Sequence, residues 1–173
     1  MSCSVKCHAR IGLMGNPSDG FEGKTLSFLL GNFFALVTIE AHEAVLILPH
    51  PQLDQEEFSS IADLNEQMST VGYYGGTRLL KATCKAFYDS VLRSGIDTTR
   101  VKGGFKISYD SNIPRMVGLS GSSAIVVAAY KCLMQFFSVT LEDLKIEKRE
   151  FPNIILNIEK NELGISAGLQ DRV

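Results

Sequence analysis

The sequence has 173 residues, of which 45% are hydrophobic and 21% charged, and its formal net charge is −2. This composition is typical of a globular domain and argues against disorder. It contains no block of Lys or Arg, which argues against nucleic acid or an anionic membrane as a partner. We see neither a membrane-spanning apolar stretch nor a signal peptide. Cys3 and Cys7 have no second Cys/His pair nearby, which argues against a zinc site. Because no signal peptide is visible, we expect a cytoplasmic protein with reduced thiols.

The first 50 residues predict a series of strands. Residues 6–15, 25–30, 33–40 and 44–48 are rich in branched and aromatic side chains. A turn cluster at 16–20 and short polar breaks separate them. Consecutive strands with such short connections predict an antiparallel meander.

The rest of the chain mixes helices with one more strand. Helices are predicted over 58–71, 77–93, 124–137 and 153–163, and a strand over 104–110. In the second helix, apolar side chains recur at spacings of four, three and four, which indicates one buried face, and a glycine follows where a helix stop is expected. Strands followed by this mixture predict an α+β fold.

Residues 118–124, Gly-Leu-Ser-Gly-Ser-Ser-Ala, lie between the last predicted strand and an apolar helix. Glycines let a backbone approach a ligand closely, and the first turn of a helix presents unpaired N–H groups to an anion. Serine hydroxyls add donors, and one of them can bind Mg²⁺. The segment therefore indicates a phosphate-binding loop, with a plain serine-capped helix as the alternative.

Two similar motifs are excluded. Residues 18–25 nearly match a P-loop, but Ser18 stands where glycine is required. Residues 118–122 nearly match the nucleophile elbow of hydrolases, but Ser122 replaces its last glycine. Such a hydrolase also needs a histidine after Ser120, and all three histidines precede it.

Three charged residues are further candidates for chemistry. Glu159 lies beside the apolar stripe of a predicted helix, so it is either a buried functional group or a solvated edge. Asp171 follows a loop with two glycines and can be a helix N-cap or a base that accepts a hydroxyl proton. Arg10 lies in an otherwise apolar strand, where a charge is costly unless it is paired or stabilises a phosphoryl group.

In this order, the motifs resemble those of the GHMP kinases. Residues 9–19 look like the family's first motif, which contacts the phosphoryl acceptor, and residues 114–124 look like its ATP-phosphate loop. Residues 158–171 are similar to the segment that supplies a Mg²⁺-binding Glu and a catalytic Asp. Further matches at 72–78 and 162–173 are similar to the glucuronokinases of this family.

The resemblance implies a fold and an extent. It implies an α+β domain of the ribosomal protein S5 domain 2-like type. Residues 1–173 would form the GHMP kinase N-terminal ATP-binding domain, incomplete at its C-terminus and truncated before the C-terminal domain.

The resemblance also implies an ATP-dependent sugar 1-kinase that converts D-glucuronate to glucuronate 1-phosphate with ATP and Mg²⁺. Asp171 would accept the proton of the 1-hydroxyl, Arg10 would stabilise transition-state charge, and Ser123 and Glu159 would hold Mg²⁺. The implied nucleotide-binding residues are Pro114, Gly118, Leu119, Ser120, Gly121, Ser122, Ser123 and Ala124. The implied sugar-binding residues are Asn16, Asp19 and Arg78.

Alternatives remain at three points. Arg78 or Arg115 could bind a uronate carboxylate, or either could be a surface arginine. The acceptor could be another sugar or an isoprenoid precursor. The chain could also be a truncated, weakly active or inactive fragment that binds nucleotide or sugar.

Overall fold

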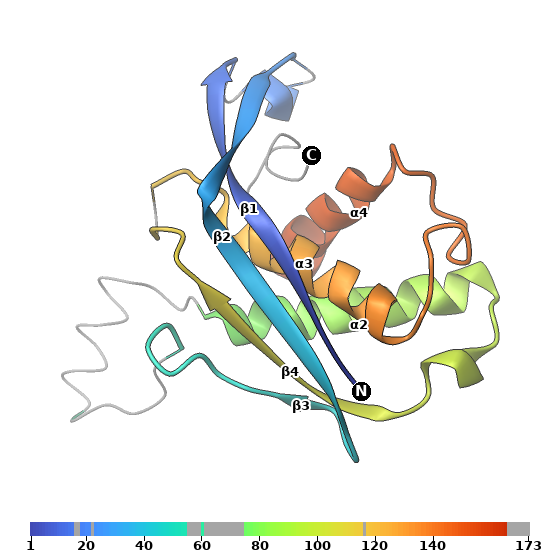
Figure 1. The fold of residues 1–173 in the computed structure, drawn as a ribbon. Helices are drawn as coiled ribbons and strands as arrows, with labels where there is room; N and C mark the ends of the chain where they lie inside the picture. Colours follow the sequence, from blue (N-terminus) through green and yellow to red (C-terminus); the bar gives the residue numbers. More distant parts are fainter. Residues whose placement is uncertain (16–17, 22, 55–59, 61–74, 116, 166–173) are drawn as a thin grey trace.

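The computed structural model describes residues 1–15, 18–21, 23–54, 60, 75–115 and 117–165. Within them the chain forms a four-stranded sheet with helices on one face (Figure 1). This arrangement confirms the predicted α+β class. The helix predicted over 58–71 lies outside the described residues, apart from residue 60.

The strands are β1 (Ser2–Met14), β2 (Leu26–His42), β3 (Leu46–Ile47) and β4 (Gly104–Ser111). Their order in the sheet is β1-β2-β4-β3, with β2 antiparallel to both neighbours and β3 parallel to β4. The predicted meander is therefore wrong in its last step. The long strand β4 pairs with β2 over eight residues, and the two-residue β3 lies at the edge.

Strand β2 is continuous where the sequence predicted two strands. Its pairing with β1 steps from Leu30↔Ala9 to Phe34↔His8, so residues 31–33 are extra residues on β2. They form a bulge within the strand rather than a turn between strands. The glycine and asparagine of this segment therefore mark an irregularity in one strand.

The helices are α2 (Gly76–Ser94), α3 (Gly121–Phe136) and α4 (Phe151–Asn157), the last continued by a π-helix, Ile158–Glu162. Short 3₁₀ turns span Ser18–Phe21 and Thr98–Val101. Helix α2 ends at Gly95, whose φ of 75° is left-handed, which confirms the predicted helix stop. Among the helices of the described residues, none combines the length and apolar character needed to cross a membrane.

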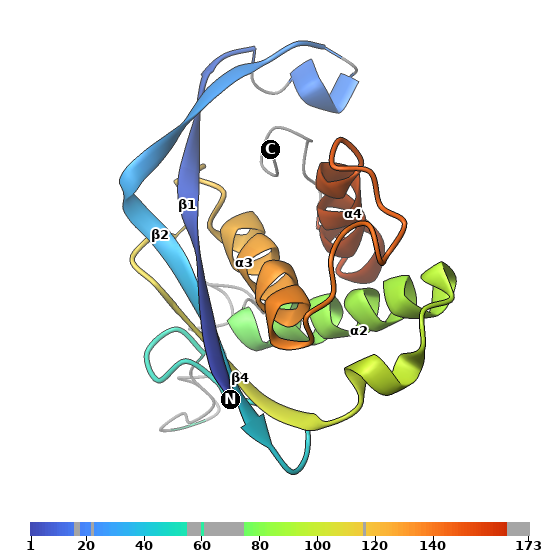
Figure 2. The ribbon, with the colours of Figure 1, turned by 45° about the vertical axis from the view of Figure 1, so that its right-hand side comes forward.

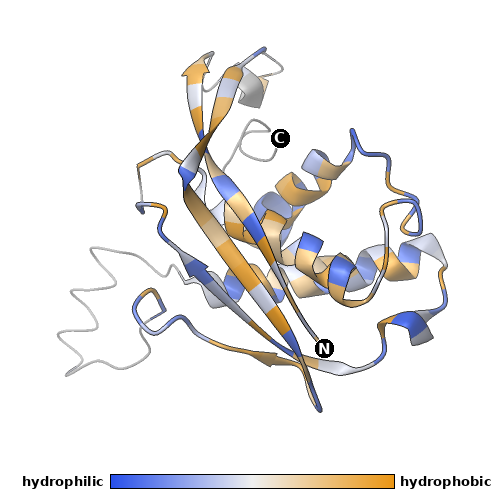
Figure 3. Cartoon of the chain, in the orientation of Figure 1, coloured by the Kyte–Doolittle hydropathy of each residue, from blue (hydrophilic) through white to orange (hydrophobic). Residues whose placement is uncertain are grey.

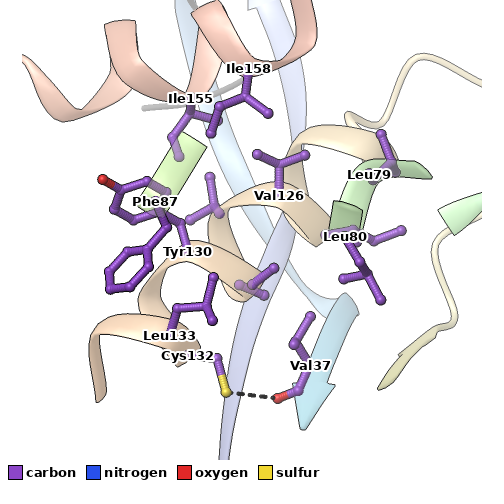
Figure 4. Packing of buried hydrophobic residues seen from close by; sticks show 14 of the residues in the cluster. Val37, Leu79, Leu80, Phe87, Val126, Tyr130, Cys132, Leu133, Ile155 and Ile158 are labelled. Carbon is purple, nitrogen blue, oxygen red and sulfur yellow. Dashed lines mark hydrogen bonds between the residues drawn. The ribbon is translucent and has the colours of Figure 1, made fainter. Parts of the chain in front are cut away.

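Helix α3 lies between the sheet and the other helices and is the centre of the core. It packs against β1, β2, α2 and α4 (Figure 2). Apolar residues follow most of its length in Figure 3, and Val126, Tyr130 and Leu133 pack with Leu80 and Ile155 in Figure 4. Each such side chain contributes about 1.5–3 kcal/mol through burial. This packing fixes the axis of α3 and therefore the position of its N-terminus.

Candidate functional site

The glycine- and serine-rich loop enters α3 through two left-handed residues. Gly118 has a φ of 74° and Ser120, the N-cap of α3, has a φ of 59°. A Cβ on Gly118 would meet no atom within 4 Å, so this position needs glycine for its backbone angle rather than for space. The Ala124 N–H donates to the Ser120 carbonyl at 2.9 Å. The N–H groups of the three residues between them face the open end of the helix, where an anion binds favourably.

Glu159 lies under the first turn of α3. Its side chain is 0% exposed. The Ser122 hydroxyl donates to one carboxylate oxygen at 2.7 Å, and the Ser123 hydroxyl donates to the other at 2.8 Å. Burial of a carboxylate is costly unless hydrogen bonds compensate, and a bond to a charged group contributes about 1.5–3 kcal/mol. The structure therefore brings Ser123 and Glu159 together and excludes the solvated-edge reading of Glu159.

The position of Glu159 depends on an irregular helix. Pro152 lies in the first turn of α4, where its missing N–H has no helical partner. The isoleucines 155 and 158 are buried against the core. The chain then widens into the π-helix that contains Glu159, a conformation often found at functional sites. The Ile165 N–H donates to the Glu159 carbonyl at 2.8 Å, which holds the following segment beside this residue.

Arg10 is adjacent to the loop. It lies in β1 with 6% of its surface exposed, and its backbone N–H donates to the Leu119 carbonyl at 3.3 Å. This bond joins the first strand to a segment more than 100 residues later. A guanidinium at this point keeps its charge at any physiological pH.

A second cluster fixes the N-terminus of α2, where Arg78 lies half-buried in the first turn. The buried Asp54 carboxylate accepts the backbone N–H of Gly76 at 2.5 Å and that of His50 at 2.9 Å. Burial, followed by the neighbouring Asp54 carboxylate, raises the pKa of the Tyr109 phenol above its usual value. The structure therefore holds the start of α2 with a carboxylate from outside that helix.

The remaining predicted residues are placed only in part. Arg115 is exposed, and its guanidinium donates to the carbonyl of Leu53, the residue before Asp54, at 2.8 Å. Pro114 is exposed before the loop. Asn16 and Asp171 lie outside the described residues, and Asp19 is described only as part of a 3₁₀ turn.

Two contributions were not predicted from sequence. The first is the equal part of Ser122 in holding Glu159, since the sequence analysis assigned it only to nucleotide. The pair of adjacent serines was the available signal. The second is Asp54, which bonds to Gly76 at a separation of 22 residues. No local pattern identifies that contact, because Asp54 caps a helix to which it does not belong.

Comparison with known proteins adds sequence evidence. A probable glucuronokinase 2 of Arabidopsis thaliana is 52% identical over 165 residues, which cover 95% of this chain and 43% of that protein. Glucuronokinase 1 of the same organism is 50% identical, over 95% of this chain and 44% of its own length. The chain thus spans less than half the length of these curated relatives.

Solved structures support the fold. The galactokinase of Lactococcus lactis, solved with galactose, superposes with a TM-score of 0.67 at 20% identity, over 99% of this chain and 40% of that one. Residues 78–173 match the family described as GHMP kinases N terminal domain. This match covers more than half of the chain and includes the loop, Ser122, Ser123 and Glu159. The chain belongs to the GHMP kinase family and has the fold of its N-terminal domain.

Proposed function

We propose that this chain supplies the MgATP-binding part of a sugar 1-kinase whose acceptor is D-glucuronate. The observation that carries the proposal is the pairing of Ser122 and Ser123 with the buried Glu159 at the N-terminus of α3. The identity of 50–52% to two glucuronokinases supports the acceptor. ATP and glucuronate are then the small-molecule partners.

The loop would hold the ATP phosphates. Backbone N–H groups at the start of α3 and the positive end of its dipole favour an anion there. The left-handed angles of Gly118 and Ser120 shape the loop around that end of the helix. Residues 118–124 would therefore surround the β- and γ-phosphates, with Pro114 at the edge of the nucleotide site.

Ser123 and Glu159 would hold Mg²⁺. A hydroxyl has one proton and two lone pairs, so Ser123 can donate to Glu159 and still offer a lone pair to a cation. Carboxylate and hydroxyl oxygens are hard ligands that suit Mg²⁺, which usually keeps water and phosphate oxygens as well. Bound Mg²⁺ would neutralise charge on the phosphate oxygens.

The acceptor side rests on the family resemblance. Asp171 would take the proton from the sugar's 1-hydroxyl as its oxygen bonds to the γ-phosphorus of ATP, while the bond from that phosphorus to the bridging oxygen breaks and ADP leaves. Arg10 would stabilise charge on the transferring group. Arg10 is supported by its backbone bond to the loop. Asn16 and Asp19 would orient sugar hydroxyls, and Arg78 would bind the uronate carboxylate.

The test is ATP turnover with a panel of glucuronate, galactose, fucose and mevalonate. We expect phosphorylation of glucuronate, and loss of about 100-fold or more in kcat for Asp171→Asn, since general bases contribute at least that much. Glu142→Gln, at an exposed carboxylate, is the control. Full activity of Asp171→Asn would exclude it as the base. ATP binding without turnover of any acceptor would replace the proposal with a nucleotide-binding fragment.

A further inference from the structure

A cleft lies between the end of α2, residues 144–146 and α4. Its volume is about 350 Å³, enough for a small organic molecule. Ile146 and Ile154 provide an apolar wall, and Arg93, Lys145 and Asn157 line the same space. The cleft therefore combines an apolar surface with groups that carry hydrogen-bond donors.

The polar lining carries positive charge. Arg93 and Lys145 are both exposed, and neither forms an ion pair within the described part of the chain. None of the described residues that line the cleft is acidic. Asn157 accepts a long bond from Asn161 through its side-chain oxygen, at 3.5 Å, which leaves its NH₂ group as a donor. The end of α2, residues 144–146 and α4 therefore each contribute a hydrogen-bond donor to the lining of the cleft, and two of these donors are cationic.

Ser90, which lines the cleft, connects it to a buried hydroxyl of α3. Tyr130 of α3 is 0% exposed, and its hydroxyl has no hydrogen-bond partner of good geometry among the described residues. It lies against Ser90, which lines the cleft and whose own hydroxyl proton goes to the Ala86 carbonyl at 2.9 Å. The Arg93 guanidinium donates to the same Ser90 oxygen at 3.3 Å. Ser90 is thus the hydrogen-bonding neighbour of the Tyr130 hydroxyl, and Ser90 and Arg93 form a polar part of the cleft lining.

We propose that this cleft binds a small organic oxyanion, a carboxylate or phosphate monoester with a short apolar body. Arg93 and Lys145 hold the charged group, because a planar guanidinium and an ammonium together match an oxyanion. The isoleucine wall contacts the apolar body. None of the described residues that line the cleft belongs to the phosphate loop at 118–124.

The experiment is a titration of the 173-residue chain with phenyl phosphate, benzoate and inorganic phosphate, followed by amide NMR. We expect saturable shifts at Ser94, Ile146 and Asn157 with phenyl phosphate or benzoate, with a Kd near or below about 1 mM. Inorganic phosphate, which has no apolar body, should bind at least about tenfold more weakly at these signals. Signals of residues 118–124 report the phosphate loop separately.

Variants decide the assignment. The double variant Arg93→Gln/Lys145→Gln should raise the Kd at the cleft signals by about tenfold or more. Lys81→Gln, an exposed cation earlier on α2, is the matched control and should bind as the wild type does. Shifts confined to residues 118–124, no saturation at the cleft signals, or unchanged affinity in the double variant would each overturn the proposal.

Discussion

Ser123 donates its hydroxyl proton to Glu159, 36 residues later in the chain, at an oxygen–oxygen distance of 2.8 Å. Ser122 donates to the other oxygen of the same carboxylate, at 2.7 Å. These two bonds join the first turn of α3 to the π-helix that follows α4. The candidate site is therefore also a tertiary contact that stabilises the fold.

The first prediction concerns this contact. Ser123→Ala removes a hydroxyl donor from a buried carboxylate, so we expect the free energy of unfolding to fall by about 1.5–3 kcal/mol. Urea denaturation without nucleotide or divalent cation measures the change. In a double-mutant cycle with Glu159→Gln, the two substitutions should couple, because the first removes the donor of this bond and the second removes the charge of its acceptor. Additive effects would show that the bond contributes little to stability.

The second prediction concerns Gly76 at the start of α2. A Cβ there would overlap the ring of Tyr109, which is buried, so the ring would have to shift within a packed core. We expect Gly76→Ala to lower the free energy of unfolding by about 1–3 kcal/mol, although alanine is the better helix former. Gly31→Ala is the matched control, since a Cβ at Gly31 meets nothing within 4 Å. Equal stability of the two variants would contradict the overlap.

The third prediction concerns two thiols. The sulfur atoms of Cys3 and Cys132 are 3.5 Å apart, across the interface of β1 and α3. We expect diamide, which accepts two electrons and two protons, to convert this pair to a disulfide. Burial raises the pKa of the Cys84 thiol to about 12 and also raises the pKa of the Cys132 thiol. Diamide should therefore react first at the partly exposed Cys3, and the neighbouring Cys132 sulfur then displaces the reduced diamide to close the disulfide.

Peptide mapping by mass spectrometry detects the disulfide between Cys3 and Cys132. Cys3→Ser should abolish it and Cys84→Ser should leave it intact. A link that used Cys7 or Cys84 instead would show that the two sulfur atoms do not meet in solution.

The fourth prediction concerns pH. The Arg100 guanidinium and two donors of Thr140 hold the pKa of Asp143 well below its usual range. A lowered folded-state pKa adds stability above the unfolded pKa of about 3.9, and this stability is lost as the pH falls further. We expect Asp143→Asn to melt below the wild type at pH 7, with a gap that narrows below about pH 4. A gap that stays constant with pH would exclude the ion pair as its cause.

Local signals predicted most of the fold. The glycine after Ser94 correctly indicated the end of α2, and the lack of a polar face correctly indicated that α3 is buried. Pairing between distant strands was not predictable in the same way. Glycine and asparagine at 31–32 fit a turn or a bulge equally well locally, and the partner strand β1 decides between them. The parallel position of β3 likewise depends on β4, which lies more than 50 residues later.

The site was predictable where its residues form short motifs. The loop before α3 was found from its own composition, and the structure places it at a helix N-terminus. For Glu159, sequence left a buried and a solvated reading open, because its partners are 36 and 37 residues away. The roles of the other site residues stay predictions, and Asp171 awaits the activity assay.

The two serine bonds to Glu159 have a consequence for how the protein responds to chelators. A carboxylate that is already satisfied by internal donors does not require a cation to be buried. Proteins whose folding is driven by metal, such as zinc fingers, unfold when the metal is removed. In this protein the fold would not need the cation, so EDTA should leave the melting temperature of the nucleotide-free chain unchanged. EDTA should nevertheless weaken ATP binding, because it removes the Mg²⁺ that would bind together with the nucleotide.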